Sequence, residues 1–199
     1  LEIARALARR ARLLLLDEPL TGLDAALHRE MLGFLAAWAR EHGITVLYAT
    51  HNAIEAVSFA SRIALLFEGR LIQTGSPEEV YRHPVSPLAA SLLGACSLLP
   101  ARIVVGGRLS CSLGEFAADG NHVPGDGWAC FRPHELQISA LNGDEPGHIE
   151  QRYFQNGVWL YQVRLRDAMV FVQAAEKWEN GAAVGIRPCG NPAFIESKG

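Results

Sequence analysis

The chain has 199 residues, of which 49% are hydrophobic and 20% are charged. This balance excludes a disordered chain and supplies enough apolar side chains for one large or two small domains. A net charge of −3 and a pI near 6.2 exclude the basic surface typical of nucleic-acid binding, and no apolar run is long enough to span a bilayer. The four cysteines form no CxxC motif, which predicts free thiols in a reducing compartment, with a disulfide or a metal site as the alternative.

The first residues alternate helix and strand signals. The apolar spacing over 1–10 predicts a helix without an N-cap, which we interpret as continuing from residues before Leu1, and no signal-peptide pattern is visible there. A strand is predicted over 13–16, followed by a helix over 25–42, which ends at Gly43. The run over 44–50 is almost continuously apolar and predicts a strand covered on both faces.

The same alternation continues to about residue 93. The segment 52–61 predicts a short helix, and 62–67 predicts a strand that turns at Glu68-Gly69 into a hairpin. The stretch Ser76-Pro77-Glu78-Glu79 is a capping-box signature with proline in the first helical position, so a helix is predicted to begin there. Strands that alternate with helices predict an α/β fold with a mostly parallel sheet.

The pattern changes near Gly94, where helical periodicity fades and turn signals multiply. In 159–166, apolar residues alternate with Leu160 and polar residues, as expected for a half-buried strand. Several short strands separated by turns predict a small barrel or sandwich. The sequence therefore predicts an α/β domain over 1–93 and an all-β domain over 94–199. The β-prone runs are 101–105, 128–133, 135–140, 148–154, 159–165, 168–174 and 182–188.

Two adjacent carboxylates, Asp17 and Glu18, follow the run of leucines in "LLLLDEPLTGLD". Parallel strands in α/β sheets present their functional residues at the carboxyl edge. One carboxylate there could hold hydrated Mg²⁺, and the other could take a proton from a reacting water. The alternative is an exposed strand end with turn-forming acids. For His51, at the end of the next predicted strand, the alternative is an ordinary strand-end histidine.

Read together, these segments resemble the ATP-binding cassette of ABC transporters. "LLLLDEP" resembles the Walker B strand, "TGLD" the D-loop and His51 the switch histidine. "LEIARALARRA" is similar to the helix that follows the signature motif, and "FEGRLIQTGSPEEVYRHP" to the stretch that closes the cassette. The order and spacing of the segments carry the resemblance, because each is weak alone.

The resemblance implies a role for each matching residue. Asp17 would hold Mg²⁺ through water, and Glu18 would be the general base that polarises the attacking water. His51 would contact and sense the γ-phosphate of ATP. Asp24 would act across the interface of a dimer, because two such cassettes sandwich ATP between them.

Other parts of the nucleotide site do not occur in the 199 residues. Neither the phosphate-binding GxxxxGK[ST] motif nor LSGGQ is found. The chain therefore resembles the C-terminal part of a cassette protein and is expected to be inactive on its own. The apolar strands over 13–16 and 44–50 are expected to expose apolar surface unless further sheet neighbours are supplied.

The second half resembles the C-terminal part of importer ATPases that carry a TOBE (transport-associated OB-like) domain. "YRHPVSPLAASLLGACSLLPARI" is similar to the junction before that domain, and "FRPHEL" to its "RPE" stretch, with His134 in place of the acid. The sequence of this junction is most similar to that of ferric-iron importers, and then to that of sulfate, polyamine and phosphonate importers. Arg132 and His134 are interpreted as a solvated strand-to-turn corner, or alternatively as a regulatory site for a small ligand or anion.

The resemblance implies an ATP-hydrolysing subunit that uses ATP and Mg²⁺ to energise solute import, with ferric iron as the solute it suggests first. Its partners would be transmembrane permease subunits, a second copy of the subunit and, indirectly, an extracytoplasmic solute-binding protein, and it would lie peripherally on the cytoplasmic face of the plasma (inner) membrane. One alternative is a non-catalytic regulatory or dimerisation fragment without a Walker A motif. Import of sulfate, polyamine or another small solute is a second. A soluble cassette protein of DNA repair or translation is a third, which the 94–199 part disfavours.

Overall fold

The structure is a computed structural model that describes residues 11–118, 122–141, 143–155, 157–166 and 168–197. The helix predicted over 1–10 lies outside the described residues. The chain divides into two compact units, Leu1–Ile63 and Ala64–Gly199, which we call the α/β unit and the β unit. The predicted division into domains over 1–93 and 94–199 stays a prediction.

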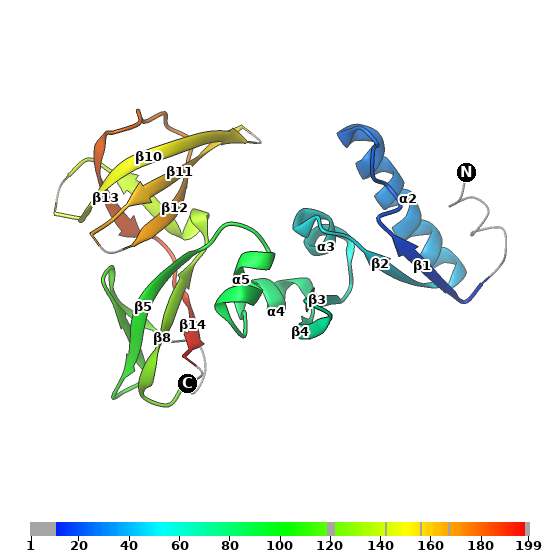
Figure 1. The fold of residues 1–199 in the computed structure, drawn as a ribbon, viewed down its shortest axis with the longest axis horizontal. Coiled ribbons are helices and arrows are strands. Elements are labelled where there is room, and N and C mark those ends of the chain that lie inside the picture. Colours follow the sequence, from blue (N-terminus) through cyan, green and yellow to red (C-terminus); the bar gives the residue numbers. More distant parts are fainter. Residues whose placement is uncertain (1–10, 119–121, 142, 156, 167, 198–199) are drawn as a thin grey trace. The chain divides into compact units, whose positions relative to one another are not determined.

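The α/β unit contains a small parallel sheet and two helices. In that sheet Leu13 lies opposite Thr45 and Asp17 lies opposite Ala49. Gly43 ends the long helix in a left-handed conformation with φ of 62°, as predicted from its position. The elements are β1 (Leu13–Asp17), α2 (Ala25–His42), β2 (Thr45–Ala49) and α3 (Ala53–Phe59) (Figure 1).

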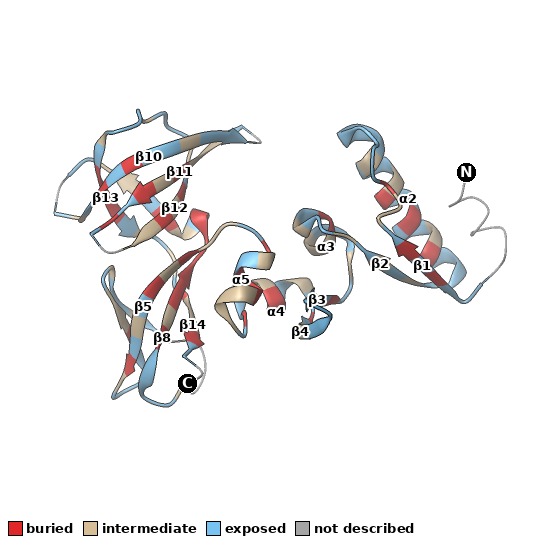
Figure 2. Ribbon diagram, in the orientation of Figure 1, coloured by how far each residue is buried: buried red, intermediate tan, exposed pale blue. Residues whose placement is uncertain are grey.

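Only one face of this sheet is covered. Leu14 and Leu16 on β1 pack against Leu35 of α2, whereas Leu15 and Leu47 are 66% and 63% exposed. The prediction that the second strand is covered on both faces is therefore wrong within the described residues. The physical reason is that α2 covers one face and no described element of the unit covers the other (Figure 2).

A hairpin and two short helices come next, and the boundary between the two units falls at the first residue of that hairpin. Glu68 and Gly69 have φ of 47° and 71°, the left-handed pair that a tight two-residue hairpin turn requires. Ser76 caps the next helix by accepting from Glu79 N at 3.2 Å, and the Glu79 carboxylate accepts from Ser76 N in return. The second helix was not predicted, although Ser86 caps it and Pro87 is its first residue. These elements are β3 (Ile63–Phe67), β4 (Arg70–Gly75), α4 (Pro77–Arg82) and α5 (Pro87–Leu92).

Two five-stranded sheets follow, in the orders β14-β8-β5-β6-β7 and β12-β11-β10-β13-β9. The neighbouring strands of both sheets pair antiparallel. Strands β6, β7 and β14 are additional to the predicted β runs. The elements are β5 (Ser97–Val104), β6 (Arg108–Cys111), β7 (Gly114–Ala117), β8 (Gly125–Phe131), the 3₁₀ turn η1 (Pro133–Glu135), β9 (Leu136–Ser139), β10 (Glu145–Gln155), β11 (Val158–Arg164), β12 (Met169–Ala174), β13 (Ala183–Pro188) and β14 (Ala193–Glu196).

The two sheets share one hydrophobic core. Leu99 and Phe131 contribute from one sheet, and Tyr161 and Val172 contribute from the other. Ser97 Oγ accepts a hydrogen bond of 2.8 Å from Phe171 N, which ties β5 to β12 across the core. The predicted fold class, an α/β part followed by a small all-β part, is confirmed, and the β part is built as two packed sheets (Figures 1 and 2).

The part of the chain that the structure describes shows no disulfide and no helix that could serve as a membrane span. Its cysteines, Cys96, Cys111, Cys130 and Cys189, are all free thiols, as predicted. None of its helices combines the length and the apolar character needed to cross a bilayer.

Candidate functional site

The predicted site residues lie at the carboxyl edge of the β1–β2 sheet. Asp17 ends β1 opposite Ala49, so Glu18 and His51 leave the two strands at the same edge. Glu18 N donates to Ala49 O at 3.0 Å, which continues the pairing by one residue. Glu18 has φ of 45°, a left-handed conformation that is uncommon for residues other than glycine and that is enriched at functional sites.

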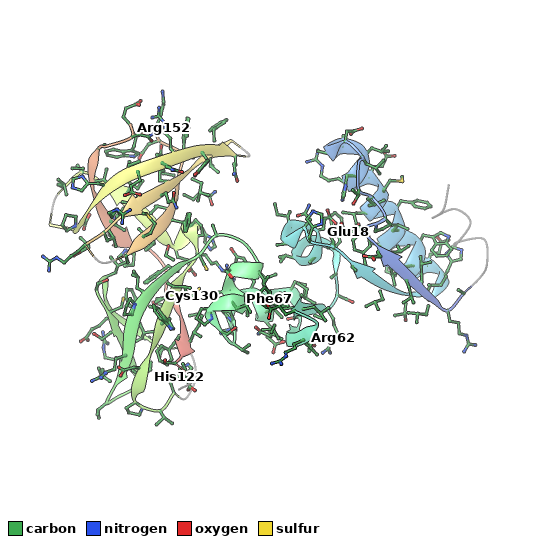
Figure 3. The ribbon with its side chains drawn as sticks, viewed as in Figure 1. Glu18, Arg62, Phe67, His122, Cys130 and Arg152 are labelled. Carbon is green, nitrogen blue, oxygen red and sulfur yellow. The ribbon has the colours of Figure 1, made fainter. Side chains whose placement is uncertain are left out.

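Glu18 and His51 form a close pair across this edge. His51 Nδ1 lies 2.5 Å from Glu18 Oε1, and the His51 backbone N–H donates to the same oxygen at 2.8 Å. Thr21 Oγ1 donates to the other carboxylate oxygen at 3.3 Å. The pair is open to solvent, since the His51 side chain is 83% exposed. The structure thus brings two of the predicted site residues into direct contact (Figure 3 labels Glu18).

The pairing shifts the pKa of both groups. The hydrogen bond from the His51 side chain is the main cause that lowers the pKa of Glu18, with smaller help from the His51 backbone N–H and from Thr21. The hydrogen bond to Glu18 raises the pKa of His51 in turn. Glu18 is therefore ionised near neutral pH, the state in which a carboxylate can accept a proton.

The other two predicted residues are placed separately. Asp17 is exposed at the last position of β1. Asp24 is the N-cap of α2, and its Oδ1 accepts from Ala26 N and Leu27 N, each at 3.0 Å. These backbone N–H groups lower the pKa of Asp24. A local capping role accounts for the position of Asp24, and its predicted role across a dimer stays a prediction.

Sequence reasoning missed a fourth acid, Glu55, which is buried at 8% exposure near the start of α3. Its Oε2 accepts from Thr50 Oγ1 at 2.9 Å and from Tyr48 OH at 3.3 Å. Its Oε1 accepts from Asn52 Nδ2 at 2.7 Å. His28 Nε2 lies 2.9 Å from the same oxygen, within ion-pair distance, although its N–H is not aligned for a hydrogen bond.

This network fixes the residues on either side of the histidine. Thr50 and Asn52 flank His51, and Glu55 bonds to both of them. Thr50 Oγ1 also accepts from Asn52 N at 3.0 Å, which closes the turn. Burial, followed by the Glu55 carboxylate, raises the pKa of Tyr48, so its hydroxyl stays a donor. A glutamate in the first turn of a short helix, four residues after a strand-end histidine, was the signal available in the sequence.

The TOBE-like motif is placed differently from its first interpretation. Arg132 is buried at 4% exposure, whereas His134 is exposed. The Arg132 guanidinium donates to Ala90 O and Tyr81 O, both at 3.0 Å, and its Cζ lies 4.1 Å from the centre of the Tyr81 ring. The interpretation as a solvated corner is therefore wrong for Arg132, because the carbonyls of α4 and α5 take the place of water.

Comparison with known proteins identifies the family to which the chain belongs. No protein-family model matches the chain. It is 39% identical over 167 residues to the Fe(3+) ions import ATP-binding protein FbpC of Pseudomonas fluorescens, which covers 82% of this chain and 47% of that protein. It is 41% identical over 138 residues to the sulfate/thiosulfate import ATP-binding protein CysA of Bacillus cereus, covering 69% of this chain and 39% of that protein.

A third relative is the spermidine/putrescine import ATP-binding protein PotA of Thermotoga maritima, 48% identical over 102 residues, or 51% of this chain and 28% of that protein. The chain belongs to the family of ABC importer ATP-binding subunits. It spans about half the length, or less, of the relatives it matches.

Among the described residues, Asp17 is the side chain that fits a magnesium ligand at the edge of the β1–β2 sheet. The described residues contain no group of three or more His, Cys, Asp or Glu side chains that could hold a metal ion. Mg²⁺ is usually held by one or two carboxylates together with water and substrate phosphates, rather than by a complete protein cage. The exposed carboxylate of Asp17 at the sheet edge fits such a shared arrangement.

Proposed function

We propose that this chain supplies the general base and the γ-phosphate histidine of an ATP-hydrolysing importer subunit. The observation that supports the proposal is the Glu18–His51 pair, with Nδ1 and Oε1 2.5 Å apart at the carboxyl edge of the β1–β2 sheet. That edge is where parallel α/β sheets bind their ligands, and the relatives are named as ATP-binding proteins of import systems.

In the proposed reaction Glu18 accepts the proton of the water that attacks the γ-phosphorus. The water's oxygen forms the new bond to phosphorus as the bond to the leaving ADP oxygen breaks. Because Nδ1 of His51 pairs with Glu18, Nε2 is the nitrogen that would meet a γ-phosphate oxygen. Glu55 is a positioning residue in this scheme, since it bonds to Thr50 and Asn52 on either side of His51.

The remaining roles follow the family pattern. Asp17 would hold Mg²⁺, which supplies positive charge to the phosphates when it is bound. Asp24 would face a second copy of the subunit across bound ATP, while its backbone contacts keep the carboxylate ionised. The partners in this proposal are a permease, a second copy of this subunit and, indirectly, a solute-binding protein. The proposed location is the cytoplasmic face of the plasma (inner) membrane. None of the described helices is long and apolar enough to span a membrane.

For the solute we propose ferric iron, because the sequence resembles ferric-iron importers first and an Fe(3+) import protein is 39% identical over 82% of the chain. A spermidine/putrescine import protein covers as much, 83% of the chain at 37% identity, and a sulfate/thiosulfate import protein covers 69%, so these are the competing solutes. We assign residues 94–199 to a TOBE domain on the basis of the two packed sheets and the sequence resemblance. Uptake of radiolabelled Fe³⁺, spermidine and sulfate in cells with and without the gene tests the choice, and it fails if spermidine or sulfate uptake is the one lost.

Glu18→Gln in the whole subunit that contains this chain tests the catalytic assignment. An amide has nearly the same shape but cannot take the water's proton, so ATP turnover should fall about 10²–10⁴-fold while ATP binding is kept. Glu30→Gln, at an exposed position of α2, is the matched control and should turn over ATP at the parent rate. Parent-rate turnover by Glu18→Gln would refute the role of Glu18.

A non-catalytic regulatory or dimerisation role is the second candidate, and the lack of a GxxxxGK[ST] motif in the 199 residues favours it for this stretch alone. The loop backbone, lysine and hydroxyl of that motif supply much of the phosphate grip in P-loop enzymes. Calorimetry of the 199-residue chain with Mg-ATP should therefore show no tight binding, and a phosphate-release assay should show no turnover. Tight binding with turnover would show that the motif is dispensable here.

A further inference from the structure

Two thiols share one face of the β5–β8 ladder. Leu98 lies opposite Cys130 and Ser97 lies opposite Phe131 in the antiparallel register. Because side chains alternate between faces along a strand, Cys96 and Arg132 extend the Leu98–Cys130 face by one step at the same end. This face packs under Ala90 of α5 in a small cluster separate from the main core. We call Cys96, Cys130 and Arg132 the thiol cluster (Figure 3 labels Cys130).

The two thiols differ in access. Cys130 is buried at 2% exposure inside the ladder. Cys96 is half-buried and precedes the first residue of β5, so ladder hydrogen bonds do not hold its backbone. Cys96 packs against the cluster that contains Cys130. Hydrogen bonding with the Cys130 thiol, followed by the charge of Arg132, lowers the pKa of Cys96 against the opposing effect of burial. The same contact and burial raise the pKa of Cys130.

Arg132 places a cation beside the thiols. Its two terminal nitrogens donate to Ala90 O and Tyr81 O, but its buried Nε has no hydrogen-bond partner. The ion pairs found among the described residues do not include Arg132. A buried cation without a carboxylate partner favours a neighbouring anion, and the Cys96 thiolate can provide one.

We propose that Cys96 and Cys130 form a thiol–disulfide exchange site that reacts with small-molecule disulfides, Cys96 being the attacking thiol and Cys130 the resolving thiol. The assignment of roles follows from access and charge, because the attacking sulfur must be reachable and ionised. The pair is independent of the proposed ATPase chemistry, which uses residues of the α/β unit.

The proposed reaction has two balanced steps. In the first, the Cys96 thiolate attacks one sulfur of the small disulfide, its S–S bond breaks, and one thiolate leaves. In the second, Cys130 loses its proton to solvent and attacks the Cys96 sulfur of the mixed disulfide, which releases the second thiolate. The two released thiolates take up the two protons given up by the cysteines. The small disulfide is reduced to two thiols, and the two cysteines are oxidised to one disulfide.

Closure would tie the end of the α5 segment to the sheet. The residues between α5 and β5 contain Cys96, and β8 is an internal strand of its sheet, between β14 and β5. A Cys96–Cys130 bond would therefore fix the entry of the chain into β5, at the point where the mainly helical segment 77–92 gives way to the two sheets. Disulfide geometry requires the two Cβ atoms to approach closely, and the backbone of Cys96 can move because it lies outside the ladder.

Oxidised glutathione is the probe that tests the site, applied to the reduced 199-residue chain near pH 7 with peptide mass spectrometry as the readout. The expected product is a Cys96–Cys130 linked peptide that has lost two hydrogen atoms. In Cys130→Ala the reaction should stop at a glutathione adduct on Cys96. A stable glutathione adduct on Cys96 of the unmodified chain, or no reaction at either cysteine, would overturn the proposal.

Cys189 provides an internal control because it is exposed but burial of its sulfur raises its pKa. Each unit of pKa changes the thiolate fraction about tenfold, so iodoacetamide should alkylate Cys96 faster than Cys189 near pH 7 despite the lower exposure of Cys96. Arg132→Gln should slow alkylation of Cys96 but not of Cys189. Faster alkylation of Cys189 in the unmodified chain would contradict an activated Cys96, and an equal slowing at both sites would contradict a local effect of Arg132.

Discussion

The two units of the chain bury their apolar side chains to very different extents. In the β unit, Leu99 is 1% exposed and Tyr161 is fully buried in a core shared by two sheets. In the α/β unit, Leu15 and Leu47 are 66% and 63% exposed on a sheet that α2 covers on one face only. The β unit therefore closes its own core, whereas the α/β unit, which carries the candidate catalytic residues, has one layer of packing.

The difference follows from how each unit is built. The β unit pairs most of its strands antiparallel in two five-stranded sheets, so inward-facing residues of both sheets meet. The α/β unit has two parallel strands whose residues are apolar on both faces, a pattern typical of sheets covered on both sides. An isolated two-stranded sheet is only marginally stable in water. We infer that the sequences of these two strands are suited to a larger sheet.

The largest expected effect compares two matched substitutions, Leu99→Ala and Leu47→Ala. Leu99→Ala removes a fully buried side chain and should lower the free energy of unfolding of the β unit by about 2–5 kcal/mol. Leu47→Ala removes an exposed side chain and should change stability by less than about 0.5 kcal/mol. Urea unfolding monitored by amide NMR signals of each unit measures both. Equal losses for the two substitutions would break the comparison.

A smaller effect is expected from Glu55→Gln, which tests whether polar contacts stabilise the α/β unit. The Tyr48, Thr50 and Asn52 side chains donate to the Glu55 carboxylate, and the NH₂ group of Gln cannot accept from them. The free energy of unfolding of the unit should therefore fall by about 1–3 kcal/mol. Hydrogen exchange at the amides of α3 should report the loss. Glu30→Gln on the exposed side of α2 is the control and should leave exchange unchanged. Equal protection in Glu55→Gln would mean that the network does not stabilise this turn.

Local signals account for most of what could be predicted from the sequence. Gly43 as the end of α2, the Ser76 capping box and the Glu68-Gly69 turn depend on neighbouring residues and were predicted correctly. The same holds for β1 and for the alternation along β11. The short strands β6, β7 and β14 were missed because each has only four residues and none lies within a longer β-prone run, unlike β9, which has the same length but lies within the run 135–140.

Features that depend on contacts between distant residues were not predictable in the same way. Glu55 gains its role from partners on α2, β2 and the following turn, which come together only in the fold. Arg132 is buried because carbonyls of Tyr81 and Ala90 accept from it. Asp17, Glu18 and His51 could be placed at one sheet edge from sequence, but the direct Glu18–His51 contact required the structure.

The smallest expected effect is the pH dependence of the α/β unit. The pKa of Glu18 is below its ordinary value of 4.5, so its stabilising contribution is complete above pH 4.5 and is lost as pH falls through the lowered pKa. The pKa of His51 is above its ordinary value of 6.5, so its contribution is complete below pH 6.5 and is lost as pH rises through the raised pKa. The stability of the α/β unit, measured as a function of pH by unfolding followed at Trp38, should be highest between these two pKa values. In Glu18→Gln the stability should depend less on pH over the same range. An unchanged profile in Glu18→Gln would exclude the pair as its source.

The central claim is that Glu18 and His51 act as one coupled pair, and an NMR titration of the histidine ring signals tests it most directly. The 199-residue chain and its Glu18→Gln variant should be titrated under the same conditions. We predict that the His51 pKa lies above its ordinary value in the parent chain and falls toward that value in the variant. A His51 titration that is identical in both chains would contradict the account.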